Sequence, residues 1–199
     1  ETIWLAVADC TGHGVPGAFM SMLGISLLNE ISGQYSGQPT NEIMDELRDQ
    51  VIASLGQTGD RYEAKDGLEM GLLAINPKTR EIQFTGAMHN LFIFRNGELE
   101  VIKGDRMPVG IHSEGNTLFT SHSMKLGRGD TLYMFSDGYA DQFGGKDRKK
   151  FGSSRLKALL AQLQKNIMHD QKEAIKKEFE QWKGKQEQID DVLMIGIKL

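Results

Sequence analysis

Cysteine is nearly absent from this chain of 199 residues: Cys10 is the only one, so no disulfide can form within it. That composition fits a reducing compartment, and we expect a cytoplasmic location. Basic charge is also in deficit, since the formal net charge is -4, and this argues against nucleic-acid binding through a basic surface. No apolar run reads as long enough to cross a bilayer, so we expect no membrane span in this chain.

The remaining composition is that of an ordinary globular protein, with 39% hydrophobic and 25% charged residues. The length suits one sizeable domain, and we take residues 1–199 as a single domain. The order of patterns is strand, two helices, several strands, two helices, strand. Turn residues at Asn76–Thr79 and Arg95–Glu98 indicate hairpins. An α+β fold is therefore predicted, with antiparallel sheet packed against helical layers.

The first predicted helix runs from Ala18 to Ile31 and is apolar almost all round. A helix without a polar face is expected to lie inside the protein. We therefore predict that most of this helix is buried.

Three acidic positions share one context, because Asp9, Asp137 and the pair Asp190–Asp191 each adjoin a strongly apolar strand. If those strands are neighbours, the carboxylates converge and repel one another, and a divalent cation removes the repulsion. Carboxylate and carbonyl oxygens suit Mg²⁺ or Mn²⁺, which commonly activate water against phosphorus. The alternative is that each is a turn-forming aspartate; the shared context favours the cation site.

The segment Gly12–Gly17 matches G-x-G-x-x-G, the dinucleotide-binding fingerprint. The context argues against that function, because the following helix leads to a second helix and not to a strand that ends in an acidic residue. Asp9 would also repel a pyrophosphate. Gly12, Gly14 and Gly17 are better explained as residues that let the backbone turn tightly.

Several blocks together resemble the metal-dependent protein phosphatase (PPM) family, and within it the bacterial stage-II-sporulation-E-like (SpoIIE-like) branch. The blocks are ADCTGHGVPGAFMSM, DGLEMGLLAIN, GAMHNLFIFRNG, MPVGI, FSDGYAD and DDVLMIGI, in family order over essentially the whole chain. The resemblance implies a sandwich of two antiparallel β-sheets flanked by α-helical layers. It also implies hydrolysis of phosphoserine and phosphothreonine by a two-metal centre, without a phosphoenzyme intermediate.

The same resemblance assigns the metal ligands. Asp9 corresponds to the aspartate that bridges both metals, and the backbone carbonyl of Cys10 completes the shell of the first. Asp137 corresponds to the ligand of the second metal, and Asp190 to the ligand in the final block, with Asp191 beside it. The resemblance therefore implies that Asp9, Asp137 and Asp190 are the catalytic residues.

Other residues have weaker assignments. Asp66, and less so Glu69, are candidates for a loose third metal, although a turn aspartate is the simpler interpretation. His13 could serve as a general acid, and a structural role is equally consistent with the sequence. His89 and Asn90 resemble a structural turn of this branch. The loops at 56–65 and 144–150 are candidates for shaping substrate access.

The sequence departs from the family in two places. The branch has a glycine-rich block with a further metal-ligand aspartate before the first block seen here, so the resemblance implies an N-terminally truncated domain that lacks strands. Lower metal affinity, weak activity and an exposed sheet edge that pairs with a second copy are the expected consequences. In addition, Leu193 stands where the family usually has threonine.

The resemblance implies a hydrolase of bacterial signal transduction, acting on a phosphorylated partner protein such as an anti-anti-sigma-type regulator. Mn²⁺ or Mg²⁺ would be its cofactor, and a sensor or regulatory domain would lie upstream, so the chain could be the cytoplasmic part of a membrane-anchored sensor. Two alternatives remain open at this point. One is a non-catalytic scaffold of the same fold, and the other is a metal-dependent phosphoester hydrolase of small molecules.

Overall fold

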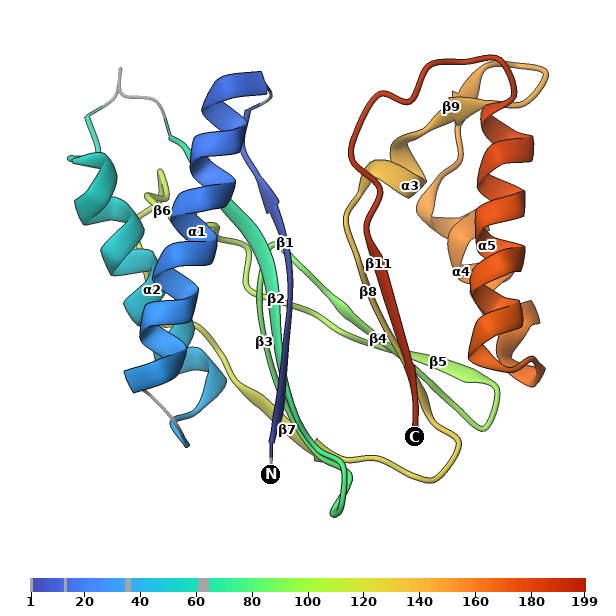
Figure 1. Ribbon diagram of the computed structural model, residues 1–199, viewed down its shortest axis with the longest axis horizontal. Helices are drawn as coiled ribbons and strands as arrows, with labels where there is room; N and C mark the ends of the chain where they lie inside the picture. The colour runs from blue at the N-terminus through green and yellow to red at the C-terminus, as the bar shows by residue number, and fades with distance from the viewer. Residues whose placement is uncertain (1, 13, 35–36, 61–64) are drawn as a thin grey trace. The chain divides into compact units, whose positions relative to one another are not determined.

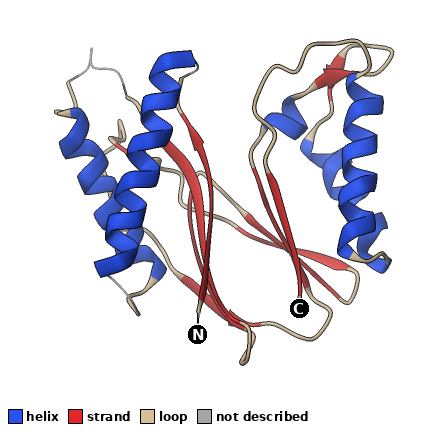
Figure 2. Ribbon diagram, in the orientation of Figure 1, coloured by secondary structure: helices blue, strands red, loops and turns tan. Residues whose placement is uncertain are grey.

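The computed structural model describes residues 2–12, 14–34, 37–60 and 65–199, which form two compact units (Figure 1). Unit 1 comprises Glu1–Leu91 and Ile102–Leu126, and unit 2 comprises Phe92–Val101 and Gly127–Leu199. Each unit has its own antiparallel sheet and its own helices (Figure 2). That residues 1–199 act as a single domain stays a prediction.

Unit 1 is built on a sheet in the order β1-β2-β3-β7, with β6 paired to β2, and all of these pairs are antiparallel. Its strands are β1 (Ile3–Cys10), β2 (Gly67–Asn76), β3 (Glu81–Ala87), β6 (Val109–Gly110) and β7 (His122–Lys125). Its helices are α1 (Gly14–Gln34) and α2 (Thr40–Leu55). The glycine turn after β1 therefore leads directly into α1.

Unit 2 has a sheet in the order β11-β8-β4-β5 and a small hairpin of β9 and β10. The sheet strands are β4 (Leu91–Arg95), β5 (Glu98–Ile102), β8 (Thr131–Phe135) and β11 (Met194–Lys198), and the hairpin strands are β9 (Phe143–Gly144) and β10 (Lys149–Lys150). The helices are α3 (Gly138–Asp141), α4 (Ser153–Gln162) and α5 (Met168–Lys183), with a 3-10 turn at Leu163–Lys165. The two acidic blocks of this unit, at 137 and 190–191, adjoin the neighbouring strands β8 and β11.

The core of unit 1 lies between the sheet and the two helices, which cover the same face of it (Figure 1). Helix α2 contributes Ile43, Met44, Leu47 and Val51 at helical spacing. Alternate residues of β2 supply the opposing surface, since side chains along a strand point to opposite faces. The sheet edge that carries Asp9 is thereby held on a packed base.

The core of unit 2 is largely aromatic. The ring of Tyr139 on α3 lies 5.1 Å from that of Phe151 and 5.0 Å from that of Phe179 on α5, measured between centroids. Phe151 also meets Trp182 edge-to-face at 5.5 Å, and edge-to-face pairs are favoured by the quadrupole of the rings. These contacts fasten α3, and with it the turn at Asp137, to the C-terminal helices.

The prediction that the first helix is mostly buried is wrong. Four apolar residues of α1, Val15, Phe19, Met22 and Ile25, are 64–69% exposed. They follow one another at intervals of three or four positions and therefore lie along one face of the helix. The opposite face, with Met20 and Ile31, packs into the core. The helix is apolar on both faces, so its composition did not indicate that only one face is buried.

Helix α1 is relevant to the expectation that this chain has no membrane span. Over Gly14–Ile31 it is long and apolar enough to span a bilayer by length and composition, and no other helix in the described part of the chain is. Core helices of soluble proteins and signal sequences pass the same test, and the absence of a membrane span stays a prediction.

The predicted fold class is confirmed, since antiparallel sheets and helices account for the described residues. The dinucleotide alternative is excluded by topology, because β1 pairs antiparallel with β2 and, among the described residues, no strand that follows α1 pairs parallel with β1. Strands β1 and β11 each lie at the edge of their own sheet. Pairing of such an edge with a second copy stays a prediction.

The two faces of the helical layer in unit 1 predict different responses to truncation. Leu47→Ala removes a side chain that is 1% exposed and should lower the free energy of unfolding by about 2–5 kcal/mol. Phe19→Ala removes one that is 68% exposed and should change it by less than about 0.5 kcal/mol. Urea unfolding followed by circular dichroism measures both. A loss at Phe19 as large as at Leu47 would contradict the exposed position of this face.

Candidate functional site

In unit 1, the acidic candidates gather where β1 ends beside the start of β2. Asp9 stands directly opposite Glu69 in the antiparallel register, and opposed residues share one face of the sheet. Like charges in that position repel each other. A cation near this pair would convert the repulsion into attraction, so the donor chemistry fits a hard divalent ion.

The end of β1 is tied to the start of β2 by Thr11. Its backbone N–H donates to the Gly67 carbonyl at 3.0 Å, and its hydroxyl oxygen accepts from the Gly67 N–H at 2.9 Å. The same hydroxyl lies 3.2 Å from Oδ1 of Asp66, to which it can donate. Asp66 thus has a structural contact, which supports the simpler interpretation of this residue.

The glycines after β1 allow a tight backbone turn, as predicted. Gly12 has φ +89°, a left-handed conformation that favours glycine. A Cβ on Gly17 would lie 2.8 Å from the carbonyl oxygen of Gly12, so a side chain there would force the turn open. Cys10 is half-buried, and its thiol accepts from the Ser21 hydroxyl at 3.4 Å. His13, and residues 61–64 of the loop at 56–65, lie outside the described residues.

In unit 2, the structure brings Asp137 and Asp190 together. Asp137 precedes α3 at the end of β8, and Asp190 lies in the segment that leads into β11. A Cβ at Gly138 would lie 2.4 Å from the carbonyl oxygen of Asp191 and 3.3 Å from Cβ of Asp190. Only glycine at 138 allows this approach, which explains why the residue after Asp137 has no side chain.

The pKa of Asp137 is raised above its ordinary value, first by burial and then by the negative charge of Asp190. Asp141 raises it further, while the ammonium group of Lys150 lowers it. Lys150 itself is paired with Asp141 at 2.7 Å. A carboxyl group whose ionisation is disfavoured by burial and by a neighbouring carboxylate belongs to a site that a divalent cation would stabilise.

Ser136 holds the two acidic blocks of unit 2 in place. Its hydroxyl donates to the Asp191 carbonyl at 2.8 Å and accepts from the Leu193 N–H at 3.0 Å. Its own N–H donates to the Leu193 carbonyl at 3.0 Å. Sequence reasoning assigned Ser136 no role, although its position between an apolar strand and a candidate ligand was a usable signal. The backbone of Leu193 is thereby held whatever its side chain, which is 42% exposed.

A second set of contacts holds the segment before β11. The buried Gln142 donates through Nε2 to the Glu187 carbonyl at 2.9 Å, and its own carbonyl accepts from Nε1 of Trp182 at 3.0 Å. Gln188 donates to the Asp190 carbonyl at 2.8 Å. Side-chain hydrogen bonds therefore replace a regular ladder along this segment and position Asp190.

His89 and Asn90 have the contacts of structural residues. The His89 ring is 7% exposed and lies against Gly71, where a Cβ would come within 2.6 Å of ring carbon Cδ2. Oδ1 of Asn90 accepts from the Gly104 N–H at 3.2 Å. Burial lowers the pKa of His89 to about 4, so the ring is neutral at physiological pH.

Ser136→Ala should lower the free energy of unfolding by about 1–3 kcal/mol, because it removes two partly buried hydrogen bonds, one to the Asp191 carbonyl and one from the Leu193 N–H. Denaturant unfolding measures the loss. Ser154→Ala is the matched control, since Ser154 is exposed in the first turn of α4, and it should stay within about 0.5 kcal/mol. Equal effects of the two variants would show that Ser136 holds nothing.

His89 should make stability fall in acid. The unfolded ring has a pKa near 6.5 and the folded ring about 4, so the unfolded state binds the proton first as the pH drops. Stability is complete above the unfolded pKa and is lost as the pH falls from 6.5 towards 4, by about 3 kcal/mol in all. Urea unfolding at pH 7 and pH 4 of the native chain and of His89→Gln isolates this share. An identical pH dependence in both proteins would refute it.

Comparison with known protein families agrees with the family indicated by the sequence motifs. The sequence model of the family described as Stage II sporulation protein E (SpoIIE) matches residues 1–199. No curated protein sequence matches the chain.

Solved structures share the fold. The SiaA-PP2C domain of Pseudomonas aeruginosa superposes with a TM-score of 0.85 at 25% identity, over 100% of this chain and 79% of that one. The PP2C phosphatase domain of SpoIIE from Bacillus subtilis, solved with a fragment of its regulatory domain, gives 0.74 at 18% identity, over 100% of this chain but only 55% of that one. RsbX in complex with magnesium gives 0.62 at 15% identity, over 98% and 80%. Because the family match covers every residue, the chain belongs to the SpoIIE family, within the metal-dependent protein phosphatases.

Proposed function

We propose that this chain is a metal-dependent protein phosphatase domain that hydrolyses phosphoserine and phosphothreonine on a partner protein. The observation that carries the proposal is the approach of Asp137 and Asp190, two carboxylates from separate sequence blocks, across a glycine that admits no side chain. Membership of the SpoIIE family supports the same chemistry. Turn-forming aspartates would have no reason to be held so close.

The proposed metal ligands are Asp9, the carbonyl of Cys10, Asp137 and Asp190. Their oxygens match the preference of Mg²⁺ and Mn²⁺, and none of the proposed ligand atoms is a thiolate sulfur or an imidazole nitrogen, which zinc prefers. When bound, such ions activate a water towards phosphorus and offset the charge of the phosphoryl group. The magnesium complex of RsbX supports a divalent ion in a domain of this fold. Glu69, opposite Asp9, is a further candidate for a loosely held third ion.

The chain's own residues account for the positioning of these ligands. Ser136 fixes the backbone of Asp191 and Leu193, and so the direction of the Asp190 side chain. Gly12 and Gly17 shape the turn that follows Asp9 and Cys10. Positioning of this kind keeps like charges close before any ion arrives, which raises the affinity of the site for a cation.

The proposed substrate is a phosphorylated regulatory protein, and an anti-anti-sigma-type protein is the candidate. The chain covers 55% of the solved SpoIIE chain, which also contains part of a regulatory domain. A sensor or regulatory domain attached to this one, and a cytoplasmic location, belong to the same proposal.

Calorimetry with Mn²⁺ and with Mg²⁺, together with phosphate release from a phosphoserine peptide, tests the proposal. Asp9→Asn and Asp190→Asn should each lower metal affinity and turnover by about 100-fold or more, because removing a ligand costs at least as much as removing its supporting residues. Asp49→Asn is the matched control, since Asp49 is exposed on α2 and forms its ion pair with Arg48 at 3.7 Å. It should leave both quantities unchanged.

The outcomes separate the alternatives. Metal binding without hydrolysis of any phosphoester would favour a scaffold of the same fold. Hydrolysis of a nucleotide in preference to the phosphopeptide would favour a small-molecule phosphoesterase. Metal affinity that survives in both aspartate variants would overturn the assignment of the ligands.

A further inference from the structure

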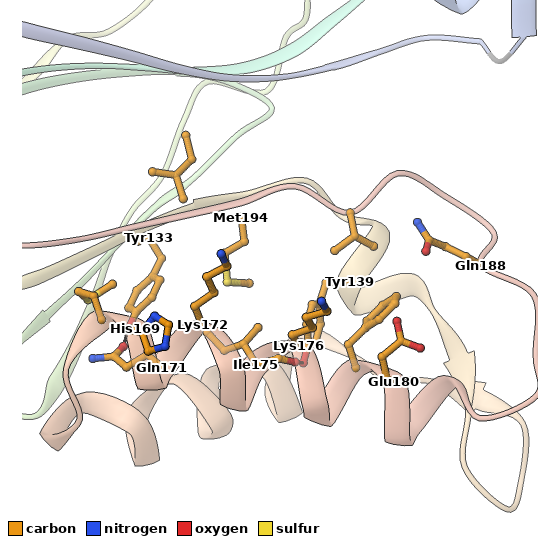
Figure 3. Close-up of a pocket in the computed structure, with 15 residues that line it drawn as sticks. Tyr133, Tyr139, His169, Gln171, Lys172, Ile175, Lys176, Glu180, Gln188 and Met194 are labelled. Atoms are coloured by element: carbon orange, nitrogen blue, oxygen red, sulfur yellow. Dashed lines mark hydrogen bonds between the residues drawn. The ribbon is translucent and has the colours of Figure 1, made fainter.

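Unit 2 contains a cavity that the proposed phosphatase reaction does not use, and neither Asp137 nor Asp190 lines it. Its volume is about 690 Å³, within the range of roughly 300–1,000 Å³ found for small-ligand sites. It lies between α5 and β11 (Figure 3). The walls are mainly apolar and are formed by Tyr133, Tyr139, Met168, Ile175, Phe179, Val192, Met194 and Ile195.

Gly196 helps to shape the cavity wall. A Cβ there would lie 2.6 Å from the terminal methyl carbon of Met168 and 3.0 Å from the Tyr133 ring. The side chain of Met168 on α5 therefore packs against the backbone of β11 at this glycine. The larger side chains that line the cavity on either side of Gly196 do not fill the space between α5 and β11.

The neutral polar groups of the cavity already have partners. The Tyr133 hydroxyl donates to Oε1 of Gln171 and accepts from Nε2 of Gln164. The Tyr139 hydroxyl donates to the Ile175 carbonyl at 2.8 Å. These groups give a ligand little to bind, so recognition must come from the apolar walls and from charge.

The charge at the rim is positive. His169, Lys172 and Lys176 follow one another on α5 at spacings of three and four, so they share one face. Figure 3 shows both lysines extending from α5 to the side of β11. Within the described residues neither lysine takes part in an ion pair or a hydrogen bond. The one acidic residue of the rim, Glu180, is paired with Lys183 at 3.1 Å.

We propose that this cavity binds a small amphipathic carboxylate, with its hydrocarbon chain between α5 and β11 and its carboxylate at Lys172 and Lys176. Apolar walls suit a hydrocarbon body, and two cationic groups without acidic partners suit one anionic head. Gln188 and Val192 also line the cavity, so a ligand would touch the segment that carries Asp190. The proposal does not depend on the phosphatase reaction.

Decanoate, below its micelle concentration, is the probe, and NMR of methyl-labelled methionine is the measurement. Met168 and Met194 line the cavity, and their signals should shift together with one saturation curve. The buried Met44 of unit 1 should not respond, nor should Met22, which is exposed on the apolar face of α1. Decanoate should bind roughly tenfold tighter than octanoate, because two more methylene groups are buried.

Charge variants test the head-group contact. Lys172→Gln with Lys176→Gln should weaken decanoate binding at least about tenfold, while Lys177→Gln, which changes an exposed lysine outside the cavity on the same helix, should not. Decyltrimethylammonium, with the same chain and the opposite charge, should leave the Met168 and Met194 signals unchanged. All the variants are at exposed positions, so folding should persist.

Three results would overturn the proposal. The first is the absence of shifts at Met168 and Met194. The second is a response of Met22 equal to theirs, which would mean adsorption to any apolar surface. The third is equal binding of decanoate to the double lysine variant and to the native chain.

Discussion

Repulsion between carboxylates is the constraint on which the rest of the candidate site depends. Asp137 lies close to Asp190, and the pKa of Asp137 is raised first by burial and then by the negative charge of Asp190. Such an arrangement opposes folding unless other contacts hold it. Here the aromatic core under α3 and the three hydrogen bonds between Ser136 and the segment before β11 hold it.

The same constraint is met differently in unit 1. There the backbone register of β1 and β2 places Asp9 opposite Glu69, and no special loop is needed. Thr11 closes the end of the strand pair through its backbone and its hydroxyl. In unit 1 a regular antiparallel pair of strands therefore presents the acidic groups. In unit 2 the irregular segment before β11 does so.

Two helices, α1 and α5, leave apolar groups that the core does not cover or fill. Helix α2 is buried along one face and serves the core, whereas α1 turns a row of apolar residues outward. In unit 2, α5 touches β11 closely at Gly196 and leaves a cavity beside it. Exposed apolar surface and unfilled apolar space both have an energetic cost, so neither is explained by stability of the fold.

The sequence by itself determined the family, the α+β class and the candidate ligands, because these depend on short motifs and on strand and helix periodicity. FSDGYAD and DDVLMIGI are legible without a fold, since an aspartate beside an apolar strand is a local pattern. Tertiary structure decided what local patterns do not encode: which side of α1 is covered, that Ser136 ties two blocks 55 residues apart, and that α5 leaves a cavity. Those features depend on which residues distant in sequence come into contact. The hydropathy of a helix does not show which other elements pack against it.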